Sequence, residues 1–148
     1  MKNTIIVDID GTIAKVGDRL KYLQQEKKDW DSFYEHCDED EPLKDICRLV
    51  ENMWEQDYHI VFCTGRRTSV RGKTIKWIHQ HLDIGVNYDL LMRKDNDWRP
   101  DTEVKPELLA NAGITPDDVW FVLEDRDSVV GTLRGLGFRV LQVNDGKF

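Results

Sequence analysis

Short apolar runs recur along the chain, and each is followed by a longer segment of mixed polarity. The strongest runs cover residues 3–8, 58–65 and 119–125, and weaker ones cover 88–93 and 138–143. Runs of this length that are rich in Val, Ile and Phe are typical of strands buried on both faces of a sheet. We therefore expect a mostly parallel sheet built from these segments.

Apolar residues at spacings of 3, 4 and 7 predict amphipathic helices between the strands. The expected helices cover 42–56, 71–85, 105–113 and 127–137. Pro42 suits the start of the first helix, and Gly85 and Gly113 suit the ends of the second and third. Because strands and helices alternate along the chain, the expected fold class is α/β.

Residues 12–41 interrupt this alternation with a charged and aromatic insertion after the first strand. A long insertion beside the end of a catalytic strand is often a lid or a substrate loop, but an ordinary surface excursion fits equally well. Trp30, Phe33 and Tyr34 could stack on a base. Aromatic residues more often pack such an insertion against the rest of the domain, so both alternatives stay open.

The length and composition are those of one globular domain. With 148 residues, the chain is expected to form a single domain over residues 1–148, with the insertion at about 12–41. No apolar run is long enough to cross a membrane, and the first residues do not resemble a secretory signal. The three cysteines lack a CxxC spacing, which disfavours a disulfide framework and favours a cytoplasmic protein.

The formal net charge of −7 disfavours broad electrostatic binding to a nucleic-acid backbone. A small phosphorylated group can still be held by a local cluster of cations. Arginine and lysine do cluster in two segments, 66–73 and 93–99. The overall charge therefore leans towards a small substrate without excluding the end of a polymer.

Polar residues follow three of the predicted strands or begin a predicted helix. In a parallel α/β sheet, ligands bind at the carboxyl ends of the strands. Carboxylates gathered there are costly unless a cation offsets their charge, and oxygen ligands suit Mg²⁺. The residues at these positions are Asp8, Asp10, Thr64, Gly65, Arg66, Lys105, Glu124 and Asp125.

These residue types fit phosphoryl transfer. A carboxylate nucleophile at Asp8 would form an acyl-phosphate intermediate. Asp10, two residues on, could protonate the leaving oxygen and later activate water. The remaining phosphate oxygens could be held by Lys105, Thr64 and the backbone after Asp8, at Gly11 and Thr12.

The stretch "DIDGT" resembles the DxDGT signature of the haloacid dehalogenase superfamily of phosphohydrolases. The later parts follow in that family's order, with Thr64 after a strand, then Lys105, then the acidic pair Glu124 and Asp125. The resemblance implies a three-layer, Rossmann-like fold with a central parallel sheet and a small cap after the first strand.

Further stretches resemble the 3′-phosphatase domain of phage polynucleotide kinases, namely "CTGRR", "RPDTEVKPELL" and "LEDRDSVVGTLRGLGFRVLQVNDGKF". No kinase domain is present, so the resemblance implies a free-standing phosphatase. It also implies Mg²⁺ held by Asp8, the Asp10 backbone carbonyl and Asp125. Glu124 replaces the usual Asp of the acidic pair, and it would bind the metal through water or only position Lys105.

The resemblance also assigns roles to single residues. Asp8 becomes the nucleophile and Asp10 the general acid–base. Arginine contacts to substrate are implied at Arg66 and Arg99. Arg126 either faces substrate or pairs with an acidic neighbour, and Arg99 could equally be a solvated charge.

The expected function is that of a Mg²⁺-dependent phosphomonoesterase acting on a nucleotide or a nucleic-acid end that bears a phosphate. The leading substrate is a 3′-phosphate at a DNA or RNA end, and the alternative is a free nucleoside monophosphate cleaved by a 5′(3′)-nucleotidase. A phospho-aspartate receiver domain is an alternative of another class, although the order of its acidic residues differs. No obligate protein partner is evident.

Overall fold

Five parallel strands form the central sheet of the computed structural model, which describes residues 2–148. Their order across the sheet is β5–β4–β1–β6–β7. The strands are β1 (Thr4–Val7), β4 (His59–Arg67), β5 (Asp89–Arg93), β6 (Val119–Glu124) and β7 (Val140–Gln142). The predicted parallel α/β sheet is confirmed, with β1 at its centre between β4 and β6.

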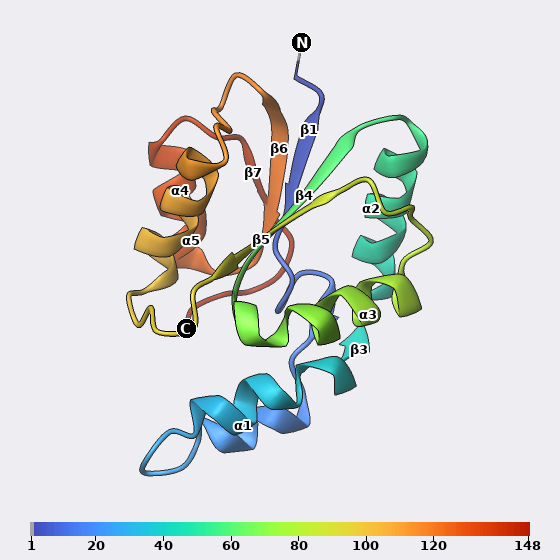
Figure 1. Cartoon of the computed structure of the whole chain (residues 1–148). Helices are drawn as coiled ribbons and strands as arrows, with labels where there is room; N and C mark the ends of the chain where they lie inside the picture. Colours follow the sequence, from blue (N-terminus) through green and yellow to red (C-terminus); the bar gives the residue numbers. More distant parts are fainter. Residues whose placement is uncertain (1) are drawn as a thin grey trace.

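Helices cover both faces of this sheet and make a three-layer structure (Figure 1). The helices α2 (Lys44–Glu55) and α3 (Arg71–His81) pack on one face. The helices α4 (Asp101–Asn111) and α5 (Asp127–Gly135) pack on the other. A short 3₁₀ turn, η3 (Thr68–Val70), joins β4 to α3.

The central strand β1 is apolar from Ile5 to Val7 because both of its faces are covered. Ile5 and Val7 belong to the core shared with α2 and α3, whereas Ile6 belongs to the core shared with α4 and α5. Successive side chains of a strand point to opposite faces, so a strand covered on both faces needs apolar residues at every position. The strand ends where the chain reaches the polar edge at Asp8.

Several helix boundaries differ from the sequence expectation. Helix α2 begins at Lys44, because Pro42 lies in a short strand and does not start the helix. Helix α4 begins at Asp101 rather than at 105, so Lys105 lies in its second turn and Pro106 lies inside the helix. Helix α3 ends at His81 because Leu82 turns into extended backbone and buries its side chain in the core. The expected stop at Gly113 is confirmed, since this residue has φ +72° directly after the capping residue of α4.

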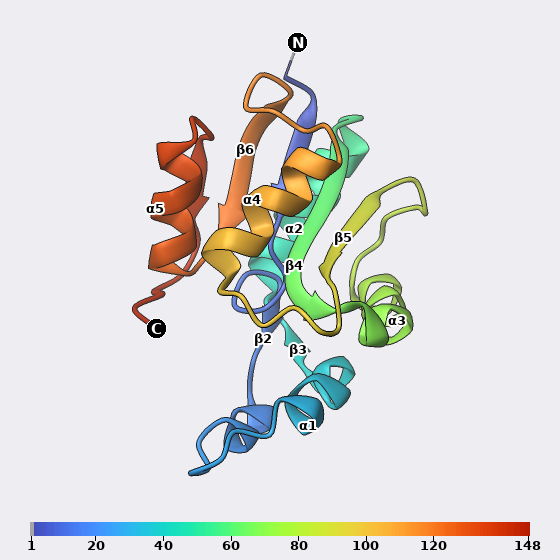
Figure 2. The ribbon, with the colours of Figure 1, turned by 60° about the vertical axis from the view of Figure 1, so that its left-hand side comes forward.

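The insertion forms a small subdomain on a two-stranded stem. The stem pairs β2 (Ala14–Lys15) antiparallel to β3 (Glu41–Pro42). Between these strands lie η1 (Asp18–Tyr22), α1 (Trp30–Glu35) and η2 (Cys37–Glu39). Figures 1 and 2 show that this subdomain lies beyond the carboxyl edge of the sheet.

Buried contacts attach the insertion to the body of the protein. Phe33 and Cys37 are buried, and Trp77 of α3 donates a hydrogen bond from Nε1 to the backbone oxygen of Asp40 at 2.8 Å. The insertion is therefore a packed element and not a loose excursion. Within residues 2–148, no helix combines the length and the apolar character needed to cross a bilayer.

Candidate active site

Asp8 lies directly after β1 and is buried. Lys105 donates from Nζ to Asp8 Oδ1 at 2.7 Å and to Glu124 Oε2 at 2.8 Å, which links the ends of β1 and β6. Thr12 donates from Oγ1 to the other oxygen of Asp8 at 2.9 Å. Both oxygens of the carboxylate are thus held in one orientation by neighbouring donors.

The glycine of the "DIDGT" stretch allows this close packing. Gly11 has φ +84°, and a β-carbon there would collide with the carboxylate of Asp125. Its N–H donates to the oxygen of Ala14, and the Thr12 N–H donates to the oxygen of Ile9. Gly11 thus brings Asp125 close and Thr12 acts through its hydroxyl, and the expected contact of these two amides with phosphate stays a prediction.

Three buried carboxylates meet beside this loop. Oxygens of Asp8, Glu124 and Asp125 lie within 4.8 Å of one another, and these residues could hold a metal ion. Burial, followed by repulsion from Glu124, raises the pKa of Asp8 well above its usual range. Burial also raises the pKa of Asp125, to about 6. A bound dication would offset this repulsion, and an all-oxygen donor set fits Mg²⁺.

Lys105 and Glu124 form the charged pair of this centre. Burial alone would lower the pKa of Lys105, but Asp8 and Glu124 outweigh burial and raise it well above its usual range. Burial alone would raise the pKa of Glu124, but Lys105 outweighs burial and lowers it. The lysine is therefore an ammonium that pairs with Glu124, and Glu124 also belongs to the three acids that could hold a metal ion.

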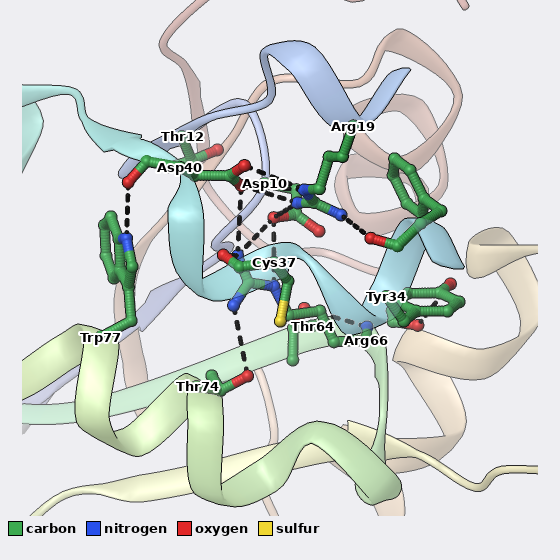
Figure 3. Close-up of polar contacts among 12 residues, drawn as sticks. Asp10, Thr12, Arg19, Tyr34, Cys37, Asp40, Thr64, Arg66, Thr74 and Trp77 are labelled. Atoms are coloured by element: carbon green, nitrogen blue, oxygen red, sulfur yellow. Dashed lines mark hydrogen bonds and ion pairs between the residues drawn. The ribbon is translucent and has the colours of Figure 1, made fainter. Parts of the chain in front are cut away.

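Asp10 has a different environment from Asp8, although only one residue separates them. Its Oδ1 accepts hydrogen bonds from Arg66 Nη2 at 2.8 Å and from Arg19 Nη2 at 2.7 Å (Figure 3). Burial opposes ionisation of Asp10, but the two guanidiniums outweigh it and lower its pKa to about 2. Asp10 is therefore an ionised, fixed carboxylate.

The insertion supplies two residues of this network that the sequence reasoning missed. Arg19 of η1 also donates from Nη2 to Asp40 Oδ2 at 2.7 Å, and both side chains are buried. Figure 3 shows Arg19 and Asp40 grouped around Asp10 with Arg66. Nothing in the charged run "GDRLKY" distinguishes Arg19 from its neighbours, so only the tertiary structure reveals it.

Arg66 holds Asp10 in this structure, and its expected contact with substrate stays a prediction. It is fully buried, and its guanidinium donates to Asp10, to Thr74 Oγ1 and to the backbone oxygen of Cys37. Burial would lower the pKa of Arg66, but Asp10 raises it. Every side-chain nitrogen of Arg66 therefore bonds to protein groups.

Thr64 and Gly65 precede Arg66 at the end of β4. Thr64 is buried, and its Oγ1 accepts a hydrogen bond from the Arg66 N–H at 3.1 Å, which leaves the hydroxyl hydrogen free to donate. A β-carbon at Gly65 would collide with Asp101 of α4. Gly65 thus has a packing role, and the phosphate contact of Thr64 stays a prediction.

Two arginines that were predicted to bind substrate, Arg99 and Arg126, lie outside the group of residues around Asp8 and Asp10. Arg99 pairs with Asp97 and Glu107 and is half exposed. Arg126 donates from Nε to the backbone oxygen of Phe148 at 2.9 Å, and its Nη1 lies 3.8 Å from Asp101 Oδ2. Neither side chain contacts Asp8 or its partners, so their expected role in binding substrate has no contact to support it.

Comparison with known proteins places this geometry in a family. The family model described as the phosphatase domain of polynucleotide kinase PNKP matches residues 2–148. A chain of the Pnkp1/Rnl/Hen1 RNA repair complex is 29% identical and superposes with a TM-score of 0.80 over 98% of this chain. A second structure of the Pnkp1/Rnl/Hen1 complex gives 29% identity and a TM-score of 0.77 over 100% of this chain.

This chain covers less than half of those two larger chains, 43% and 48% of their lengths. A haloacid dehalogenase-like hydrolase from Streptococcus pneumoniae shares the fold at 14% identity, with a TM-score of 0.63, 95% of this chain covered and 83% of that one. The buried acids around Lys105 and the family match together support one conclusion. The chain belongs to the polynucleotide kinase phosphatase family of haloacid dehalogenase-type phosphatases.

Proposed function

We propose that this chain removes 3′-phosphates from nucleic-acid ends as a Mg²⁺-dependent phosphomonoesterase with an aspartyl-phosphate intermediate. The observation that carries the proposal is the buried Asp8 carboxylate, held by Lys105 and Thr12 beside Glu124 and Asp125. When bound by these acids, Mg²⁺ would supply Lewis-acid polarisation of a phosphoryl oxygen.

The residues of the chain account for the covalent step. An oxygen of Asp8 forms a bond to phosphorus as the bond between phosphorus and the sugar oxygen breaks. Lys105, which is charged and 2.7 Å from Asp8, stabilises the negative charge on the phosphoryl oxygens. Water then attacks the acyl phosphate, which releases inorganic phosphate and restores Asp8.

Asp10 fits the second half of this cycle. An ionised carboxylate can accept the proton of the attacking water, and the pKa of about 2 keeps Asp10 ionised. Asp10 is also predicted to donate a proton to the leaving sugar oxygen in the first step. Proton donation requires Asp10 to turn away from Arg19 and Arg66, because a carboxyl with a pKa of about 2 carries no proton near neutral pH.

Two observations favour a nucleic-acid end as substrate. The family is described by the phosphatase domain of polynucleotide kinase, and two chains at 29% identity come from RNA repair complexes. Membership in a phosphatase family also argues against the receiver-domain alternative. The proposed partner is therefore a DNA or RNA strand that carries a terminal 3′-phosphate.

A matched pair of substrates tests the proposal. Phosphate release is measured with Mg²⁺ from a short 3′-phosphorylated oligonucleotide and from the corresponding free 3′-mononucleotide, with Asp8→Asn beside each. Faster, Asp8-dependent release from the oligonucleotide would support the proposal. Faster release from the mononucleotide would instead make the protein a nucleotidase, and release unaffected by Asp8→Asn would overturn the nucleophile assignment.

A further inference from the structure

A cavity lies between the insertion and the loop that joins β5 to α4. Its volume is about 410 Å³, within the range of roughly 300–1,000 Å³ that small-molecule sites occupy. Trp98 lines it and is 68% exposed. The other lining residues come from one segment of the insertion: Gln25, Lys27, Lys28, Asp29, Trp30 and Asp31.

A buried arginine with an unused nitrogen contacts two residues that line this cavity, Asp31 and Trp98. The Arg67 side chain is nine-tenths buried, and its guanidinium lies 4.9 Å from the Tyr34 ring centroid and 4.3 Å from that of Trp98. Nη1 donates to Asp31 at 2.7 Å. Within the described residues, Nη2 of Arg67 is the one buried side-chain nitrogen or oxygen without a hydrogen-bond partner.

An unpartnered buried donor is costly, and an acceptor on a bound ligand would offset that cost. The side chain of Asp31 is 90% exposed, and the Trp98 ring is also largely exposed. Exposed side chains change rotamer readily, so these two groups can shift to admit an oxygen to Nη2.

The charges around the cavity favour an anionic ligand. Both acidic residues in its lining are already occupied, since Asp29 caps α1 through Ser32 and Asp31 pairs with Arg67. Lys27 and Lys28 are exposed, and neither forms a salt bridge with any residue in the range 2–148. Two free ammonium groups therefore accompany the buried guanidinium in a chain whose net charge is −7.

The cavity is joined to the catalytic loop by short contacts. Arg67 follows Arg66, which holds Asp10. The Tyr34 hydroxyl, next to Arg67, donates to the backbone oxygen of Gly65 at 3.2 Å. A strand whose terminal phosphate reaches Asp8 past Thr64 would therefore place its next nucleotide beside Arg67 and Trp98.

We propose that this cavity binds the nucleotide next to the phosphate-bearing end of a single-stranded nucleic acid. The Trp98 ring stacks on its base, and Arg67, Lys27 and Lys28 bind its phosphodiester oxygens. Exposed aromatic rings beside mobile cations are the combination that binds single strands without base preference. The inference rests on the proposed function, because it takes the phosphate at Asp8 as the end of the same strand.

The test compares 3′-phosphorylated substrates of one, two and four nucleotides, with p-nitrophenyl phosphate as a substrate that lacks any base. Stacking of one base corresponds to a gain of about 5- to 150-fold. We expect kcat/KM to rise by a factor in this range from one nucleotide to two, and little from two to four. Trp98→Ala should remove most of the gain, and Trp98→Phe should keep most of it.

Trp120→Ala is the matched control. Trp120 is also an exposed tryptophan, but it follows Val119 near the amino end of β6 and packs against Tyr58 with tilted rings. This variant should keep the full gain from the second nucleotide. A Lys27→Gln, Lys28→Gln double variant should also lower the salt dependence of kcat/KM, by a slope of about 0.7 for one single-strand phosphodiester.

The outcomes separate the two hypotheses. If p-nitrophenyl phosphate is cleaved but no 3′-phosphorylated nucleotide is, the proposed function fails and takes this inference with it. If the 3′-phosphates are cleaved but a second nucleotide gives no gain, or if Trp98→Ala keeps the gain, only the proposed cavity is overturned. A gain lost in Trp98→Ala and kept in Trp120→Ala supports it.

Discussion

Asp8 and Asp10 belong to one short motif but to two regions with opposite electrostatics. The region around Asp8 gathers three buried carboxylates and one ammonium, so it carries excess negative charge. The region around Asp10 gathers two carboxylates and two guanidiniums and is balanced. The pKa of Asp8 is raised and that of Asp10 is lowered. Burial alone would raise the pKa of both acids, so their charge partners, and not the motif, cause the difference between them.

The largest effect on kcat is expected from a substitution of Asp8, the proposed nucleophile. Asp8→Asn removes the attacking oxygen, and kcat should fall by about 10⁴- to 10⁶-fold, as for other nucleophile substitutions. Steady-state phosphate release measures this. Asp117→Asn, at an exposed position, is the matched control and should behave like the wild-type protein. Activity within tenfold of wild type in Asp8→Asn would falsify the assignment.

The second largest effect is expected from a substitution of Arg19 in the charge-balanced region around Asp10. Arg19→Gln removes one guanidinium from Asp10 and Asp40, so the pKa of Asp10 should rise and kcat should fall by about 10²-fold, the scale of general acid–base catalysis. The protein should also lose about 3 kcal/mol of unfolding free energy, because a buried ion pair is broken. The pH profile of kcat and urea unfolding measure the two effects.

Arg48→Gln is the control for that experiment, since Arg48 is exposed on α2. If Arg19→Gln loses stability but keeps its pH profile and kcat, Arg19 is only a structural residue. A shifted acidic limb of the profile would identify it as a residue that positions Asp10.

Metal removal should destabilise the Asp8 region in a pH-dependent way. The folded-state pKa of Asp125 is raised from 3.8 to about 6, so the folded protein binds more protons between these values. Stability without metal should therefore fall as the pH rises from about 4 to 6. Mg²⁺ at 100 times its Kd should restore about 2.7 kcal/mol, or roughly 5–10 °C in Tm, above pH 6.

Thermal unfolding in EDTA and in Mg²⁺, at pH 5 and pH 7, checks this prediction. The stabilisation by Mg²⁺ should be larger at pH 7, because the carboxylates must lose their protons to bind the metal. An equal stabilisation at both pH values would contradict the raised pKa of the acidic cluster.

The smallest effect is expected from a substitution of Arg99, which tests whether the substrate-binding site extends to this residue. Arg99 pairs with Asp97 and Glu107 on the surface, and such exposed pairs contribute little. Arg99→Gln should change kcat/KM for a 3′-phosphorylated oligonucleotide by less than about threefold. A loss of tenfold or more would show that Arg99 reaches the substrate, as the resemblance to phage enzymes implies.

The residues that sequence reasoning brought together are those at strand ends. Asp8, Glu124 and Asp125 lie at the carboxyl ends of buried strands that are neighbours in a parallel sheet, so topology alone predicts that they meet. Lys105 was expected at the start of a helix and lies in its second turn, because Pro106 is tolerated inside α4. Its contact with Asp8 holds despite that shift.

The residues that could not be predicted belong to the insertion. Arg19 contacts Asp40 across 21 positions, in a segment without a regular apolar period, so no pattern fixes which of its charges turns inward. The contact between Arg66 and Asp10 could not be predicted either, and the expected contact of Arg66 with substrate stays a prediction. A lone arginine after a strand end suggests an anion, and the anion here is the protein's own Asp10.

The two-stranded stem of β2 and β3 brings both ends of the insertion to Asp10, since Ala14 bridges to Asp10 and Asp40 directly precedes β3. Local melting of the insertion would therefore withdraw Arg19 while leaving Asp8 and Lys105 in place. We expect such a partly unfolded molecule to take the phosphoryl group from substrate onto Asp8 at a normal rate and to release phosphate slowly. Fraying of this subdomain would appear in rapid-mixing experiments as a burst of phosphorylated protein. The folding of the insertion would then set the rate of phosphate release and so the rate of turnover.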